Sequence, residues 1–138
     1  MKLISWNIRG LSGTGKRRSL KNMMGQEKPQ ILFLQETKCN SSVVESTVAK
    51  IWSGSLNTAV DAEGASGGLE ILWDSRIIIL DNIHANKNFI QATFHIIGTN
   101  IHRLLTNVYF PQEALHKAEI LNALSEINHD RVHPLWIS

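Results

Sequence analysis

Two short apolar segments place the strongest limits on the fold. Residues 2–8 (KLISWNI) and residues 30–36 (QILFLQE) are rich in aliphatic and aromatic side chains, and Gly or Pro lies close to each. Short runs of this kind predict β-strands. Between them we expect a helix over residues 17–24, ended by Gly25 and then Pro29. The strand, helix and strand in this order are typical of a layered α/β domain.

The middle of the chain predicts one further helix and then mostly strands. The helix is expected over residues 41–52, with Ser41 or Ser42 as N-cap and Glu45 completing a capping box. Four β-rich segments follow, and the short polar turns between them predict an antiparallel meander. These segments cover residues 67–74, 76–83, 89–97 and 102–110.

Length and the last segments predict a single, truncated domain. A chain of 138 residues with 43% hydrophobic side chains forms at most one domain, over residues 1–138. A helix is predicted over residues 112–128, and residues 133–138 (HPLWIS) predict a strand that has just begun. Because domains normally end in a completed element, we expect this one to be cut short.

Composition excludes several classes of partner. The 14 Lys and Arg residues nearly balance the 12 Asp and Glu residues, so any signal for nucleic-acid binding must be local. No apolar run approaches the roughly 20 residues that a membrane span needs, so we expect no membrane partner. The single cysteine, Cys39, predicts an ordinary thiol and no disulfide-linked partner, and it suits a reducing intracellular compartment.

Residues 10–17 (GLSGTGKR) nearly match a nucleotide-binding P-loop. Gly10, Gly15 and Lys16 fit the pattern, but Arg17 stands where a Ser or Thr hydroxyl would bind magnesium. We therefore interpret this segment as a basic, solvated turn.

Four cations gather at the start of the first predicted helix: Lys16, Arg17, Arg18 and Lys21. The helix macrodipole disfavours cations there. A nucleic-acid backbone would benefit from them, which predicts a nucleic-acid-binding role. The alternative is that they are screened surface charges without a role.

Asn7 and Glu36 end the two apolar segments. The carboxyl ends of adjacent strands in an α/β domain meet at one edge, where ligands bind. An amide and a carboxylate supply hard oxygen ligands, which suit magnesium. Alternatively, Asn7 caps a turn and Glu36 is simply the first exposed residue after its strand.

Four motifs together carry a family resemblance. SWNIRGL, LFLQETK, SGGLEILWD and NVYFP, in this order, resemble the endonuclease/exonuclease/phosphatase superfamily. Within it the chain is most similar to the endonuclease domains of plant LINE-type non-LTR retrotransposons, which resemble apurinic/apyrimidinic endonucleases. The resemblance implies a four-layer α/β sandwich, with two mixed sheets packed face to face and helices outside, of which this chain supplies the N-terminal half.

The resemblance also implies a chemistry. It implies hydrolysis of DNA phosphodiester bonds with Mg²⁺, or alternatively Mn²⁺, and a DNA partner, or alternatively RNA, in the nucleus rather than the cytoplasm. Asn7 and Glu36 match the family's active-site Asn and metal-binding Glu, and Tyr109 matches the Tyr that contacts the scissile phosphate. Arg9 stands where apurinic/apyrimidinic endonucleases carry an acidic residue, which favours the retrotransposon branch. Glu70 departs from the pattern, and if buried it must be partnered or protonated.

Part of the family's active site is absent from the sequence. The Gly-Asp-Phe-Asn motif and the later Asp-His pair do not occur, and His84, His95, His102 and His116 are scattered without forming a cluster. We therefore expect the chain to be inactive alone, the alternatives being a non-catalytic nucleic-acid-binding remnant or a fragment without a selected role. A missing second half would leave an apolar sheet face exposed, which predicts self-association.

Overall fold

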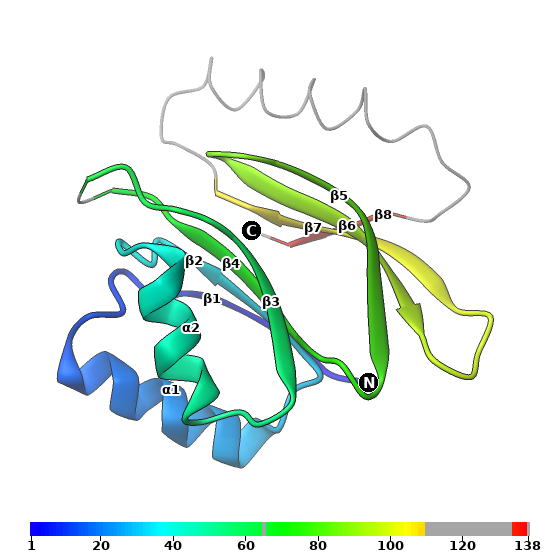
Figure 1. Cartoon of the computed structure of the whole chain (residues 1–138), viewed down its shortest axis with the longest axis horizontal. Coiled ribbons are helices and arrows are strands. Elements are labelled where there is room, and N and C mark those ends of the chain that lie inside the picture. The colour runs from blue at the N-terminus through cyan, green and yellow to red at the C-terminus, as the bar shows by residue number, and fades with distance from the viewer. Residues whose placement is uncertain (65, 110–133, 138) are drawn as a thin grey trace.

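Two four-stranded sheets and two helices make up the described part of the chain (Figure 1). The computed structural model describes residues 1–64, 66–109 and 134–137. The first sheet has the strand order β1-β2-β4-β3, from β1 (Leu3–Asn7), β2 (Ile31–Gln35), β3 (Ser55–Val60) and β4 (Leu69–Asp74). The second has the order β5-β6-β7-β8, from β5 (Ile78–Asn86), β6 (Phe89–Ile96), β7 (His102–Val108) and β8 (Pro134–Ile137). The helices are α1 (Thr14–Glu27) and α2 (Ser41–Ala49).

Strand β2 lies at the centre of the first sheet and is buried along its whole length. It pairs in parallel with β1, so that Asn7 lies opposite Gln35, and antiparallel with β4. Ile31 and Phe33 belong to the core between the sheets, whereas Leu32 and Leu34 belong to the core beneath the helices. Burial on both faces explains why this strand is a continuous apolar run.

The two sheets pack face to face around a shared apolar core. Side chains of β2 and β4 meet side chains of β5, β6 and β7 there, and the Trp73 and Phe94 rings make an edge-to-face contact at 6.4 Å between centroids. Figure 1 shows α1 and α2 on the outer face of the first sheet, away from the second. This arrangement confirms the predicted α/β sandwich. The expectation of an exposed sheet face was wrong, because the chain's own second sheet covers the inner face of the first.

A short turn carries the chain from the first sheet to the second. The Asp74 carboxylate accepts hydrogen bonds from the Arg76 backbone N–H at 3.0 Å and from the Arg76 guanidinium at 2.9 and 3.0 Å. These hydrogen bonds hold the pKa of Asp74 below its usual value. Because Trp73 pairs with Ile31 and Leu69 pairs with Gln35, the turn lies at the edge opposite the end of β2.

Helix α1 is longer than predicted at both ends. It begins at Thr14 and continues through Gly25 to Glu27, so the prediction that Gly25 ends it was wrong. Lys28 ends the helix instead, in a left-handed conformation with φ of 47°, and its N–H donates to the Met24 carbonyl. Pro29 cannot continue the helix and follows directly.

Helix α2 is shorter than predicted and has a different cap. It ends at Ala49, three residues before the predicted end at residue 52. Asn40 is the N-cap, since its side chain accepts a hydrogen bond from the Val43 N–H at 3.3 Å, so neither Ser41 nor Ser42 caps the helix.

The predicted meander holds for three of its four strands. Strands β5, β6 and β7 pair antiparallel in sequence order, whereas β4 belongs to the other sheet, between β2 and β3. Strand β3 was not predicted. The predicted last strand is confirmed by β8, which pairs in parallel with β7, and the helix predicted over residues 112–128 lies outside the described residues. Neither α1 nor α2 is long and apolar enough to cross a membrane.

Candidate metal and phosphate site at the strand ends

The backbone brings the segments after β1 and β2 together. The Ile8 N–H donates to the Gln35 carbonyl at 3.0 Å, and the Gly10 N–H donates to the Glu36 carbonyl at 2.8 Å. Parallel pairing therefore continues beyond both strands. As a result Asn7, which is exposed, and Glu36, which is half-buried, lie at the same edge of the sheet.

This edge concentrates unusual backbone conformations. Arg9, Glu36 and Lys38 have φ angles of 52°, 50° and 57°, in the left-handed region that side chains disfavour. Only two other non-glycine residues among those described share this conformation. Each such residue costs on the order of 1 kcal/mol, and strain of this kind gathers at functional sites. The geometry of Glu36 is therefore imposed by its surroundings.

Two glycines of the SGGLE motif accept backbone hydrogen bonds from the residues that follow Glu36. The Thr37 N–H donates to the Gly68 carbonyl at 3.2 Å, and the Lys38 N–H donates to the Gly67 carbonyl at 2.9 Å. Gly68 has a φ of 94°, and a Cβ there would overlap the Thr37 hydroxyl and lie 3.2 Å from the Lys38 nitrogen. A glycine is thus required for the close approach that positions Glu36.

Tyr109 meets Glu36 although the two residues follow strands of different sheets. Tyr109 follows β7, packs against the core between the sheets and donates its backbone N–H to the Asn88 carbonyl at 2.8 Å. Burial raises the pKa of the Tyr109 phenol, and its interaction with the nearby Glu36 carboxylate raises it further. The phenol of Tyr109 therefore lies near the Glu36 carboxylate, at the edge that also holds Asn7.

Asn107 fixes the two sheets to each other next to this site, and sequence reasoning missed it. Its Oδ1 accepts a hydrogen bond from Gln35 Nε2 at 2.6 Å, and its Nδ2 donates to the carbonyls of Leu34 and Glu70 at 3.1 and 2.9 Å. Both Asn107 and Gln35 are buried. The only signal in the sequence was an amide side chain within an apolar strand, two residues before Tyr109.

Glu70 is buried, partnered and protonated. It lies on the helix side of β4, where its Oε1 accepts a hydrogen bond from Asn57 Nδ2 at 2.7 Å. Asn57 Nδ2 also donates to Glu45 of α2 at 2.9 Å. Burial raises the pKa of Glu70 to about 8, and the charges of Glu45 and Asp61 act in the same direction. The requirement that a buried Glu70 be partnered or protonated is therefore met.

Three of the four predicted nucleic-acid-binding cations line one hollow. Arg17, Arg18 and Lys21 are exposed and line a hollow between α1 and α2, together with Lys50. Lys16 is half-buried and does not line it. The interpretation of residues 10–17 as a solvated turn was wrong for its second half, because α1 already begins at Thr14.

The remaining titratable side chains form no larger cluster among the described residues. The expectation that the histidines are all scattered was wrong for one pair, since the His95 and His102 rings stack at 4.3 Å. Burial raises the pKa of the Cys39 thiol, which has no disulfide partner in the described part of the chain. Within that part, no group of three or more His, Cys, Asp or Glu side chains could hold a metal ion.

Comparison with solved structures identifies the fold that these two sheets form. The AP endonuclease from Archaeoglobus fulgidus matches with a TM-score of 0.73 and 18% identity, over 99% of this chain and 55% of that one. The chain has the fold of the AP endonucleases. The 3′ phosphatase NExo from Neisseria, bound to a product DNA hairpin, matches with a TM-score of 0.67 and 20% identity, over 92% of this chain and 51% of that one.

The similarity in sequence is more limited. No model of a protein family matches the chain. The DNA repair nuclease APEX1 of Danio rerio is 38% identical in an alignment of 74 residues that covers 49% of this chain and 22% of that protein. The matched part thus spans about a fifth of this relative, and the chain spans about half of each of the two solved structures.

Proposed function

We propose that the chain carries one side of a metal-dependent site that acts on DNA phosphodiester bonds. The observation that carries this proposal is the hydrogen bond between Gln35 and Asn107, which brings Glu36 and Tyr109, from two different sheets, to the edge where Asn7 ends β1. The names of the similar proteins, a DNA repair nuclease and an AP endonuclease, support DNA as the substrate.

The donor atoms at this edge fit Mg²⁺, with Mn²⁺ as the alternative. Glu36 supplies a carboxylate and Asn7 supplies an amide oxygen, both hard ligands, and Mg²⁺ usually binds one or two carboxylates, its own waters and substrate phosphates. Glu36 would hold the ion, and Asn7 would help to place it. A bound Mg²⁺ would neutralise negative charge on the phosphate.

Tyr109 would recognise the phosphate itself. Its raised pKa keeps the phenol protonated at neutral pH, so the hydroxyl can donate a hydrogen bond to a phosphoryl oxygen. Asn107 would position Tyr109 indirectly, because it holds β7 against β2. The chain's own residues thus bind and orient a phosphodiester, but none of those described is placed as a general base.

The finer assignment rests on the motifs. We propose that residues 1–138 form the N-terminal part of an endonuclease domain of the LINE-type retrotransposon class, as Arg9 suggests, acting in the nucleus. Because the sequence contains no Gly-Asp-Phe-Asn motif, we expect no cleavage by this chain alone. A non-catalytic nucleic-acid-binding remnant is the second candidate, favoured by the basic hollow between α1 and α2.

The single tyrosine allows a direct test of the site. Because Tyr109 is the only tyrosine in the chain, absorbance of the phenolate reports its titration alone. Glu36→Gln should lower the pKa of Tyr109, since it removes the carboxylate charge that raises that pKa. Mg²⁺ should lower the pKa in the wild type by neutralising the same charge and should leave Glu36→Gln unaffected, with Glu63→Gln as the control at an exposed carboxylate.

Two results would contradict the proposal. If the pKa of Tyr109 is the same in Glu36→Gln as in the wild type, Glu36 does not lie next to Tyr109. If Mg²⁺ leaves the pKa of Tyr109 in the wild type unchanged, Glu36 does not bind the metal. Nicking of supercoiled DNA in Mg²⁺, abolished by Glu36→Ala, would show the site but contradict the expected inactivity. Salt-sensitive DNA binding without any response to Mg²⁺ would favour the remnant.

A further inference from the structure

A basic groove crosses the helix layer, away from the site at the strand ends. It consists of two adjoining hollows of about 530 and 590 Å³ that share Lys21, Lys50 and Ile51. The second hollow reaches Gln30 and Asp74, at the edge of the first sheet opposite Glu36. Six exposed cations line the groove: Arg17, Arg18, Lys21, Lys28, Lys50 and Arg76.

The groove is much more positively charged than the chain as a whole. It gathers six of the 14 Lys and Arg residues, although the whole chain has a net charge of only +2. Among the described residues, Asp74 is the one carboxylate that lines it, and Asp74 is already paired with Arg76. The remaining cations have no carboxylate partner within the described part of the chain. Such a surface attracts a polyanion.

The cations follow a line along α1. Arg17 and Lys21 are four residues apart and so lie on one face of the helix, and Lys28, the C-cap residue, lines the same groove as Lys21. A helix rises 1.5 Å per residue, so Arg17 and Lys28 are about 16 Å apart along the helix axis. Arg17 lies in the first turn, where the macrodipole disfavours a cation and where α1 has no acidic side chain. An external anion would offset that cost.

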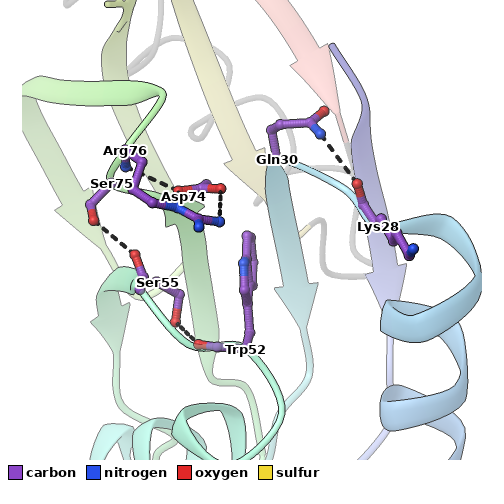
Figure 2. Close-up of polar contacts among 8 residues, drawn as sticks. Lys28, Gln30, Trp52, Ser55, Asp74, Ser75 and Arg76 are labelled. Carbon is purple, nitrogen blue, oxygen red and sulfur yellow. Dashed lines mark hydrogen bonds and ion pairs between the residues drawn. The ribbon is translucent and has the colours of Figure 1, made fainter.

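Trp52 adds an aromatic side chain to the groove. Figure 2 shows its indole pointing from the end of α2 toward the space between the Asp74 and Arg76 pair and the segment of Lys28 and Gln30. Trp52 is only half-buried, so part of the ring is accessible. A cationic groove with an aromatic side chain is the arrangement that binds unpaired bases by stacking and the backbone by charge.

From these observations we propose that the groove binds single-stranded nucleic acid, independently of the site at Glu36. A duplex would offer its phosphates but no free base for Trp52. A membrane surface would need apolar side chains beside the cations, whereas exposed ones such as Ile79 and Ile83 lie on the second sheet. The phosphate chemistry is common to DNA and RNA, so either strand type can be the ligand.

Fluorescence anisotropy with a labelled 12-nucleotide oligo(dT) tests the proposal. Comparison with oligo(rU) of the same length shows whether the groove prefers DNA or RNA. The Lys21→Glu/Lys50→Glu double variant should weaken binding at least tenfold and reduce the slope of log K against log salt by about 1.4, or 0.7 for each lost phosphate contact. The matched control is Lys87→Glu/Arg103→Glu, which changes the net charge equally at exposed positions in the β5–β6 turn and in β7. It should bind within about twofold of the wild type.

Trp52 is tested by two substitutions, because it also packs beneath the helices. Trp52→Ala should weaken binding about fivefold to hundredfold, and Trp52→Phe, which keeps an aromatic face, should recover most of it. Equal binding by the Lys21/Lys50 variant and its charge-matched control would overturn the proposal. Tighter binding of a 12-base-pair duplex, or of phosphatidylserine vesicles, would overturn the choice of ligand.

Failure of this proposal and failure of the proposed function can be told apart. Glu36→Gln should leave oligo(dT) affinity unchanged, and Lys21→Glu/Lys50→Glu should leave the Tyr109 titration and its response to Mg²⁺ unchanged. Loss of oligonucleotide binding in Glu36→Gln would place the strand at the metal site and overturn a separate groove.

Discussion

Because of Glu70, the free energy of unfolding of this protein should fall as the pH rises. Its side chain is 1% exposed, and burial raises its pKa from an ordinary 4.5 to about 8. Its carboxyl group is therefore neutral in the folded protein at pH 7, while Asn57 donates to it at 2.7 Å. Glu70→Gln keeps the shape of the neutral acid, and its amide oxygen can still accept from Asn57.

The magnitude follows from linkage. Between pH 4.5 and 8 the folded chain holds the Glu70 proton and the unfolded chain does not, so unfolding releases a proton. The stabilisation is complete below about pH 4.5 and is lost as the pH rises through about 8, at 1.36 kcal/mol per unit. Over the whole interval this amounts to about 5 kcal/mol, and between pH 5 and pH 8 to about 3 to 4 kcal/mol.

Urea denaturation from pH 5 to pH 8.5 measures this effect. The free energy of unfolding of Glu70→Gln minus that of the wild type should be small at pH 5 and should grow to about 4 kcal/mol at pH 8, because only the wild type carries the acid. Other titrating groups cancel in this difference. Glu63→Gln, at an exposed position, is the control and should track the wild type. A difference that stays constant with pH would refute a buried, neutral Glu70.

Two substitutions test the framework of the site. Gly68→Ala should destabilise the fold by at least 1 kcal/mol and weaken the response of the Tyr109 titration to Mg²⁺, because a Cβ at residue 68 displaces Thr37. Gly25→Ala, inside α1, is the control and should stabilise the helix by about 0.5 to 1 kcal/mol. Unchanged stability and Mg²⁺ response in Gly68→Ala would contradict the close approach. Asn107→Ala should lower the free energy of unfolding in urea by about 3 kcal/mol or more, because it removes the hydrogen bonds from β7 to Gln35, Leu34 and Glu70 of the first sheet; a loss below 1 kcal/mol would contradict that role.

The sequence allowed the prediction of the elements whose pattern is local. Strands β1 and β2 are short apolar runs with ends that the sequence locates, so the amino-acid pattern alone places Asn7 and Glu36 at one edge. Strand β3 could not be found, because its sequence SLNTAV is half polar and is held by pairing with β4. The sheet to which β4 belongs likewise depends on distant partners in β2, and local propensity does not record them.

The polar interior was also beyond local reasoning. Nothing near Asn107 indicates that its partners lie more than 30 residues away along the chain, at Gln35 and Glu70. The basic groove combines cations from α1, the end of α2 and the turn after β4, and only the fold brings them together. Sequence reasoning recognised the group near Arg17 because those residues are neighbours in the chain.

The passage from one sheet to the other has a consequence for how the molecule could be divided. Every described strand of the first sheet precedes Ser75, and every described strand of the second sheet follows Ile77. Glu36 and Tyr109 therefore belong to two successive lengths of polypeptide that cross over once, at the edge remote from both. A break in the peptide chain at Ser75 would spare every hydrogen-bonded pair of the described strands, so we expect two separately expressed pieces to reassemble around the shared core. The pKa of Tyr109 would then report the association of the two pieces, because Glu36 raises it only when both pieces are bound to each other.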